Sequence, residues 1–117
     1  MKRILVVEDD NLYFSIIEGD LSTEAITIIR AETLLDADDF FEKNRDDLDL
    51  IVMDACVPGD EPNSMWLVRK IISSGYKKPI IACSSSSEYR ETLMRAGATH
   101  QTNKFQAVKK IKSLLDL

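Results

Sequence analysis

Short runs of apolar residues alternate along this chain with longer stretches in which apolar residues recur every three or four positions. The short runs are typical of buried parallel strands, and the longer spacing is typical of helices that pack on one side. Strands are predicted over residues 3–8, 26–31, 49–54, 79–84 and 99–102. This repeated change of period predicts a parallel sheet with helices on both faces.

Five helices are expected after these strands. The third should cover 64–72 and end before Gly75, and the fourth should cover 88–96 and end at Gly97. The first should begin after an Asp10 cap, and the last should cover 105–117. On the packed face of the first helix we expect Leu12, Ile16, Ile17 and Leu21. On that of the second we expect Leu34, Leu35, Phe40 and Phe41, and on that of the fifth Phe105, Val108, Ile111 and Leu115.

Right-handed crossovers restrict the strand order, and the order 2-1-3-4-5 suits five strands. The sequence therefore predicts an α/β fold of the flavodoxin-like, doubly wound (βα)5 kind, a three-layer sandwich. The 117 residues are enough for one core, and no linker interrupts them, so one domain is expected over residues 1–117.

Composition narrows the kinds of partner. A net charge of -5 argues against a broad contact with nucleic acid. Only four aliphatic residues follow Met1-Lys2-Arg3, too few for a signal peptide, and no stretch is long enough to span a membrane, so a cytoplasmic protein is expected. Cys56 and Cys83 form no metal-binding or redox motif and are expected to be reduced thiols.

Polar residues stand directly after the apolar runs. Glu8 and Asp9 follow the first run, Asp54 ends the third, Ser84 follows the fourth, and Lys104 follows the fifth. In an open parallel sheet, ligands bind at the carboxyl ends of the strands, and in the order 2-1-3-4-5 the first and third strands are neighbours. The sequence therefore predicts one site that contains all five side chains.

The charges of this site indicate its chemistry. Three carboxylates and one ammonium sum to -2, which one divalent cation would neutralise, and oxygen ligands suit Mg²⁺ or Mn²⁺. A phosphoryl group could then be held by the metal, Lys104 and Ser84 while Asp54 acts as the nucleophile. The expected product is an aspartyl phosphate.

Over its whole length the chain resembles the receiver domains of response regulators in two-component signalling. The resemblance lies in the acidic pair Glu8-Asp9, in Asp54 with a proline four residues later, in Ser84, and in Lys104. It implies Asp54 as phosphoacceptor, with Ser84 and Lys104 as its catalytic partners. It also implies Mg²⁺ ligation by Glu8 through water, by Asp9, by Asp54 and by the main-chain carbonyl of Cys56.

Three features depart from the family pattern. Gln101 stands where receivers usually have a switch aromatic, which puts the usual readout in doubt. Phe105 replaces the proline that normally follows the lysine, so a trans bond and a reshaped loop are expected. Residues 60–63 lengthen the loop after Asp54 and add two acids.

The resemblance implies a phosphorelay switch that is phosphorylated by a sensor histidine kinase or phosphotransfer protein, acts on a downstream effector protein, and is not an enzyme beyond its own phosphoryl transfer and dephosphorylation. One alternative is a receiver-like interaction module that does not depend on phosphorylation, motivated by Gln101 and Phe105. The other is a metal-dependent phosphohydrolase, which the sequence disfavours because Asp54-Ala55-Cys56 supplies no second acid for a leaving group.

Overall fold

The computed structural model describes residues 1–117. Five parallel strands form one sheet in the order β2-β1-β3-β4-β5, which confirms the predicted topology. The strands are β1 (Lys2–Val7), β2 (Ile26–Ala31), β3 (Leu50–Asp54), β4 (Ile80–Cys83) and β5 (His100–Thr102). The helices are α1 (Asn11–Leu21), α2 (Leu34–Asn44), α3 (Met65–Ser73), α4 (Ser87–Ala96) and α5 (Ala107–Leu114).

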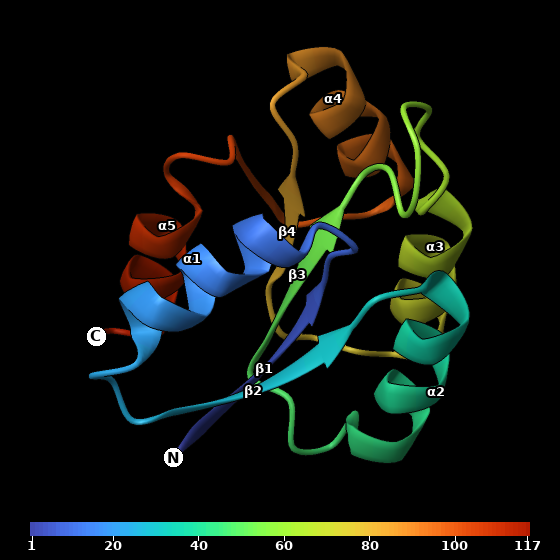
Figure 1. Ribbon diagram of the computed structural model, residues 1–117. Helices are drawn as coiled ribbons and strands as arrows, with labels where there is room; N and C mark the ends of the chain where they lie inside the picture. Colours follow the sequence, from blue (N-terminus) through green and yellow to red (C-terminus); the bar gives the residue numbers. More distant parts are fainter.

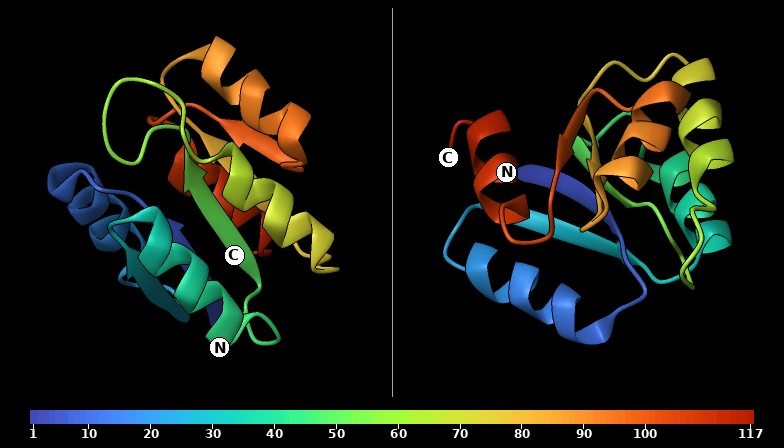
Figure 2. Two further views of the ribbon diagram at one scale, coloured as in Figure 1. Left: turned by 90° about the vertical axis from the view of Figure 1, so that its right-hand side faces the viewer. Right: turned by 90° about the horizontal axis from the view of Figure 1, so that it is seen from above.

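The sheet lies between two helical layers. Helices α1 and α5 cover one face, and α2, α3 and α4 cover the other (Figures 1 and 2). Each layer has its own core: twelve buried residues lie under α1 and α5, and nineteen lie under the other three helices. Every residue of β3 is buried because this central strand is covered on both faces.

The helix boundaries follow the local signals in the sequence. Asp10 caps α1, since its carboxylate accepts hydrogen bonds from the backbone N–H groups of Leu12 and Tyr13. Ser86 caps α4 in the same way through the N–H of Tyr89. At the other end of α4, Gly97 adopts a φ of 125°, a conformation that favours glycine.

The predicted helix faces were partly wrong. In α1 the buried residues include Phe14, whereas Leu12 and Ile16 are exposed. Leu35 of α2 is also exposed. In α1 the stripe with Leu12 and Ile16 and the stripe with Phe14 both satisfy a spacing of three or four residues, so periodicity alone could not select the face that docks on the sheet.

The end of the chain also differs from the prediction. Helix α5 begins at Ala107, and Phe105 lies before it with 95% of its surface exposed. The only cis peptide bond is Val57-Pro58, so the bond between Lys104 and Phe105 is trans, as expected. No helix combines the length and hydrophobicity needed to cross a membrane.

Candidate functional site

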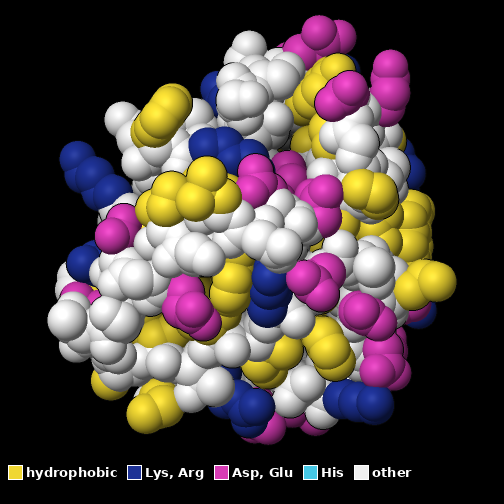
Figure 3. All heavy atoms as spheres, in the orientation of Figure 1, with side chains coloured by type: hydrophobic (Ala, Val, Ile, Leu, Met, Phe, Trp, Pro, Cys, Tyr) yellow, Lys and Arg dark blue, Asp and Glu magenta, His cyan; other side chains and the backbone are white.

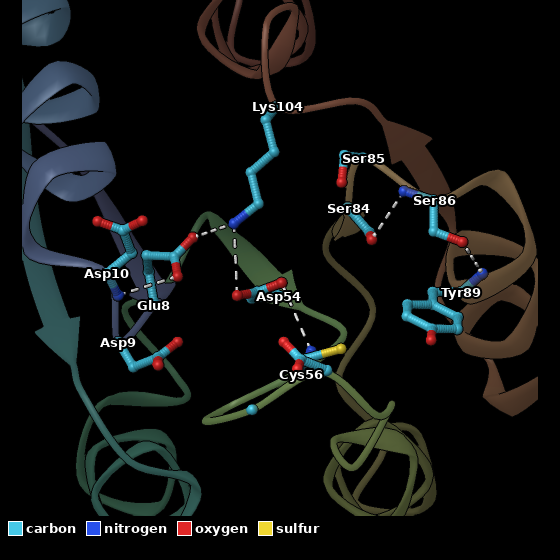
Figure 4. A pocket seen from close by; sticks show the side chains of 12 residues that line it. Glu8, Asp9, Asp10, Asp54, Cys56, Ser84, Ser85, Ser86, Tyr89 and Lys104 are labelled. Carbon is cyan, nitrogen blue, oxygen red and sulfur yellow. Dashed lines mark hydrogen bonds and ion pairs between the residues drawn. The ribbon is translucent and has the colours of Figure 1, made fainter.

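A cavity of about 310 Å³ opens at the carboxyl ends of β1, β3 and β4. All six residues singled out from the sequence line it: Glu8, Asp9, Asp54, Cys56, Ser84 and Lys104. Figure 4 shows the acids that follow β1 on one side, the serines that follow β4 on the other, and the lysine reaching down between them. In Figure 3, acidic side chains gather above the N-terminal end of α1, with basic side chains beside them.

Glu8 is the most deeply buried acid of the site, with 2% of its surface exposed. One carboxylate oxygen accepts a hydrogen bond from the N–H of Asp10 at 3.2 Å, and the other is paired with the Lys104 ammonium. Burial raises the pKa of Glu8, the neighbouring Asp54 carboxyl raises it further, and Lys104 opposes the shift. Glu8 is therefore a carboxylate that the fold holds at some cost.

Asp54 ends β3 and is 7% exposed. Its Oδ2 lies 3.4 Å from the Lys104 Nζ, and its Oδ1 lies 3.5 Å from the N–H of Cys56. The main chain behind it is fixed by the buried Ser64, whose hydroxyl donates to the Asp54 carbonyl at 2.7 Å. Asp54 thus presents its carboxylate to the cavity from a rigid backbone.

Lys104 approaches the acids from the loop between β5 and α5 (Figure 4). Burial alone would lower the pKa of Lys104, but the hydrogen bond to Glu8 and the charge of Asp54 outweigh it, so the net pKa is raised. The lysine is therefore fully charged at neutral pH. Its side chain is 24% exposed, so the ammonium also reaches the open side of the cavity.

Ser84 follows β4, and its hydroxyl accepts a hydrogen bond from the N–H of Ser86 at 3.1 Å. Its carbonyl accepts one from the Arg90 guanidinium at 2.7 Å. The same guanidinium donates to the Gln101 side chain at 3.2 Å. Gln101 is exposed on β5, so Arg90 joins the edge of the cavity to the outer surface of α4 and β5.

The donor set fits a hard divalent cation. One carboxylate oxygen each from Glu8, Asp9 and Asp54 lies within 4.8 Å of the others. Burial raises the pKa of Asp9, and the charge of Glu8 adds to that effect. Carboxylate oxygens crowded in this way are the ligands that Mg²⁺ prefers, and the cation would relieve their repulsion.

Three residues that contact the site were not found from the sequence. Tyr13 of α1 contacts Lys104, Ser64 fixes the backbone of Asp54, and Arg90 binds the carbonyl of Ser84. Ser64 stands directly before α3, where a serine usually caps the helix, but its side chain makes no cap hydrogen bond and donates to the Asp54 carbonyl instead, so the local signal would have indicated a different role. Tyr13 lies 91 positions from Lys104, so no local pattern marks it. Arg90 is only six positions from Ser84, but its residue type alone does not indicate this bond.

This arrangement defines the class of the protein: a doubly wound α/β domain with an acidic pocket at the ends of its central strands. Residues 4–116 match the family model of the response regulator receiver domain, and the chain belongs to that family. It is a receiver domain of the kind found in two-component systems. Receiver domains bind Mg²⁺ at such a pocket and act as signalling modules with kinase and effector partners.

Solved structures of low sequence identity share the fold. The signal receiver domain of a putative Luxo repressor protein from Vibrio parahaemolyticus is 20% identical with a TM-score of 0.80, over 98% of this chain and 90% of that one. The chemotaxis protein CheY4 of Vibrio cholerae is 21% identical with a TM-score of 0.76, over 97% and 98%.

A response regulator from Burkholderia pseudomallei, solved with a phosphorylated aspartic acid, calcium ion and citrate, is 16% identical with a TM-score of 0.81, over 98% of this chain and 66% of that one. No curated protein matches the sequence significantly.

Proposed function

We propose that this domain, over residues 1–117, is a phosphoacceptor switch that receives a phosphoryl group on Asp54 from a phosphohistidine of a partner kinase or phosphotransfer protein. The observation that carries the proposal is the position of the Asp54 carboxylate. It ends the central strand, lies 3.4 Å from the Lys104 Nζ, and belongs to a cluster with Glu8 and Asp9. The family match supports this reading.

The residues divide the chemistry among them. An Asp54 carboxylate oxygen attacks phosphorus, the P–N bond to the donor imidazole breaks, and the imidazole leaves with its electron pair and takes up a proton. Lys104 lies beside the nucleophile, where its ammonium can stabilise charge on a phosphoryl oxygen. The Ser84 hydroxyl lines the same cavity and can donate a hydrogen bond to another oxygen.

Glu8, Asp9, Asp54 and the main-chain carbonyl of Cys56 are the groups proposed to hold Mg²⁺. When bound, Mg²⁺ would neutralise charge on the carboxylates and on the entering phosphoryl group. Asp60 also lines the cavity and adds a negative charge at its rim. Burial raises the pKa of the Cys56 thiol, as does the charge of Asp54, so this side chain stays a neutral thiol.

The test is intact-mass spectrometry after incubation with acetyl phosphate and Mg²⁺. We expect a single phosphoryl adduct on the wild type, and none on Asp54→Asn or after chelation of the metal. An Asp60→Asn variant is the matched control, because it removes a carboxylate of the same cavity that has no proposed part in the transfer, and it should still be labelled. Labelling of Asp54→Asn equal to that of the wild type would refute the assignment.

A phosphorylation-independent interaction module is the second candidate, and Gln101 motivates it. This residue is exposed and hydrogen-bonded to Arg90, so the position usually occupied by an aromatic residue is polar here. The module predicts partner binding that Asp54→Asn leaves unchanged. Absence of both an adduct and Mg²⁺ binding would favour it.

We further propose that the domain works in the cytoplasm with an effector protein as its downstream partner. The acidic balance of the chain, with a net charge of -5, supports a protein partner over nucleic acid. The covalent chemistry proposed is the transfer to Asp54 and the later hydrolysis of the aspartyl phosphate, in which water takes the phosphoryl group and inorganic phosphate leaves.

A further inference from the structure

Tyr13 contacts Lys104 in two ways. Its hydroxyl donates a hydrogen bond to the Lys104 carbonyl at 2.7 Å, and its ring centroid lies 4.4 Å from the Lys104 Nζ. A cation at that distance from an aromatic face is attracted by the ring quadrupole. One side chain of α1 therefore contacts both the main chain and the charged end of the lysine.

Tyr13 is itself held firmly. Its backbone N–H donates to the Asp10 cap at 3.1 Å, which fixes its place in the first turn of α1. Its hydroxyl also lies 3.6 Å from the buried Cys83 Sγ at the end of β4. Burial raises the pKa of Tyr13 above its usual range, so the hydroxyl remains a hydrogen-bond donor at neutral pH.

The loop that carries Lys104 has few other anchors. The hydrogen bond from Tyr13 is the only one made to the main chain of Lys104. The next residue, Phe105, has 95% of its surface exposed, and the other hydrogen bond within this loop runs from the Gln106 N–H to the Asn103 side chain at 2.9 Å. The lysine side chain has four rotatable bonds, and holding it in one geometry costs rotamer entropy.

We propose that Tyr13 is a positioning residue for Lys104: its hydroxyl fixes the lysine backbone, and its ring holds the ammonium against Glu8 and Asp54. This inference rests on the proposed phosphoacceptor function for its effect on the reaction. The contacts with Lys104 themselves do not depend on that function. In this role Tyr13 acts on the Glu8 and Asp54 carboxylates only through Lys104.

The experiment measures the initial rate of Asp54 labelling by acetyl phosphate with Mg²⁺ in Tyr13→Phe and Tyr13→Leu. Loss of one hydrogen bond should slow Tyr13→Phe by about threefold to tenfold, and Tyr13→Leu should be slower still because it also loses the ring. Tyr76→Phe is the matched control, since it removes a tyrosine hydroxyl bond to a carbonyl, that of Leu48 at 3.2 Å, far from the cavity. It should leave the rate unchanged.

A Lys104→Met background separates positioning from a general structural effect. If Tyr13 acts through the ammonium, Tyr13→Leu should lose most of its effect there. An equal loss of rate in both backgrounds, or unchanged rates for both Tyr13 variants, would overturn the inference. Thermal unfolding followed by circular dichroism identifies variants that fail to fold.

A second readout keeps the inference testable without phosphorylation. Lys104 should react faster with an amine-selective acetylating reagent in Tyr13→Leu than in the wild type, relative to the exposed Lys109 in the same digest. A wild type that acquires no phosphoryl group on Asp54 would refute the proposed function alone. Unchanged Lys104 reactivity would refute the role of Tyr13 alone.

Discussion

Replacing Glu8 by glutamine tests whether the acidic site costs stability when no metal is bound. Glu8 is 2% exposed, and one of its oxygens lies within 4.8 Å of an Asp54 oxygen. With an effective dielectric of about 20, that separation corresponds to a repulsion of about 3.5 kcal/mol. An ion pair with Lys104 at an ordinary distance of about 2.8 Å returns about 6 kcal/mol.

Desolvation of the Glu8 carboxylate decides whether Glu8→Gln raises or lowers the free energy of unfolding. Asp9, with an oxygen within the same 4.8 Å of Glu8, adds a second repulsion of about 3.5 kcal/mol, so the three charge interactions nearly cancel. Removing a carboxylate from water costs several kcal/mol more. The raised pKa of Glu8, caused first by burial, has the same sign. Lys104 retains Asp54 at 3.4 Å after the substitution, so no charge is left unpaired. We expect Glu8→Gln to stabilise the metal-free protein by about 1 to 3 kcal/mol.

Urea unfolding in the presence of EDTA, followed by circular dichroism, measures this difference. Since the folded pKa of Glu8 is raised above its ordinary value of 4.5, the folded state binds the proton more tightly. The stability advantage of Glu8→Gln should therefore be smallest below pH 4.5, grow between pH 4.5 and the folded pKa, and level off above it. Added Mg²⁺ should reduce this difference in stability, because we expect the wild type to bind the metal more tightly than Glu8→Gln does.

Glu24→Gln is the matched control, because Glu24 pairs with Lys112 at 3.5 Å on the surface. This substitution should change the free energy of unfolding by less than about 1 kcal/mol at any pH. A Glu8→Gln variant less stable than the wild type in EDTA at pH 7 would refute the reasoning, since the pair with Lys104 would then outweigh burial.

Two further predictions concern the backbone and the thiols. Gly97→Ala should lower the free energy of unfolding by about 1 to 3 kcal/mol, because φ is 125° and an added Cβ would lie 2.8 Å from Ile72. Gly19→Ala in α1 has open space around it and should raise the free energy of unfolding by about 0.5 to 1 kcal/mol. Urea unfolding that ranks the two variants the other way would contradict this prediction. Burial raises the pKa of Cys83 to about 11 and also raises the pKa of the half-buried Cys56. Peptide mapping after iodoacetamide treatment at pH 7.5 should therefore find Cys56 modified slowly and Cys83 almost not at all. Rapid modification of Cys83 would contradict this prediction and show that the end of β4 is accessible to the reagent.

The strand order could be predicted because it depends on signals that are local in the chain. Each strand is a short apolar run, each helix has an amphipathic period, and right-handed crossovers leave few orders for five strands. The same rule brings the ends of β1 and β3 together, which is why the sequence alone predicts Glu8, Asp9 and Asp54 in one cavity.

The helix faces could not be assigned in the same way. Two stripes of α1 satisfy the helical spacing, and only docking on the sheet buries Phe14 and leaves Leu12 exposed. Phe105 looked like the first core residue of the last helix, but α5 begins two positions later and leaves this ring in solvent. A wrong face costs nothing locally, so the choice belongs to the packing of the whole domain.

The sequence by itself determined the order of the elements and the chemical groups at the strand ends, because both depend on residue type and on neighbours in the chain. Tertiary structure decided how those groups are held. The contacts of Tyr13 with Lys104 join residues 91 positions apart, and Arg90 of α4 reaches Gln101 of β5. Such contacts are set by how helices dock on the sheet, and docking depends on the fit of whole surfaces rather than on any local pattern.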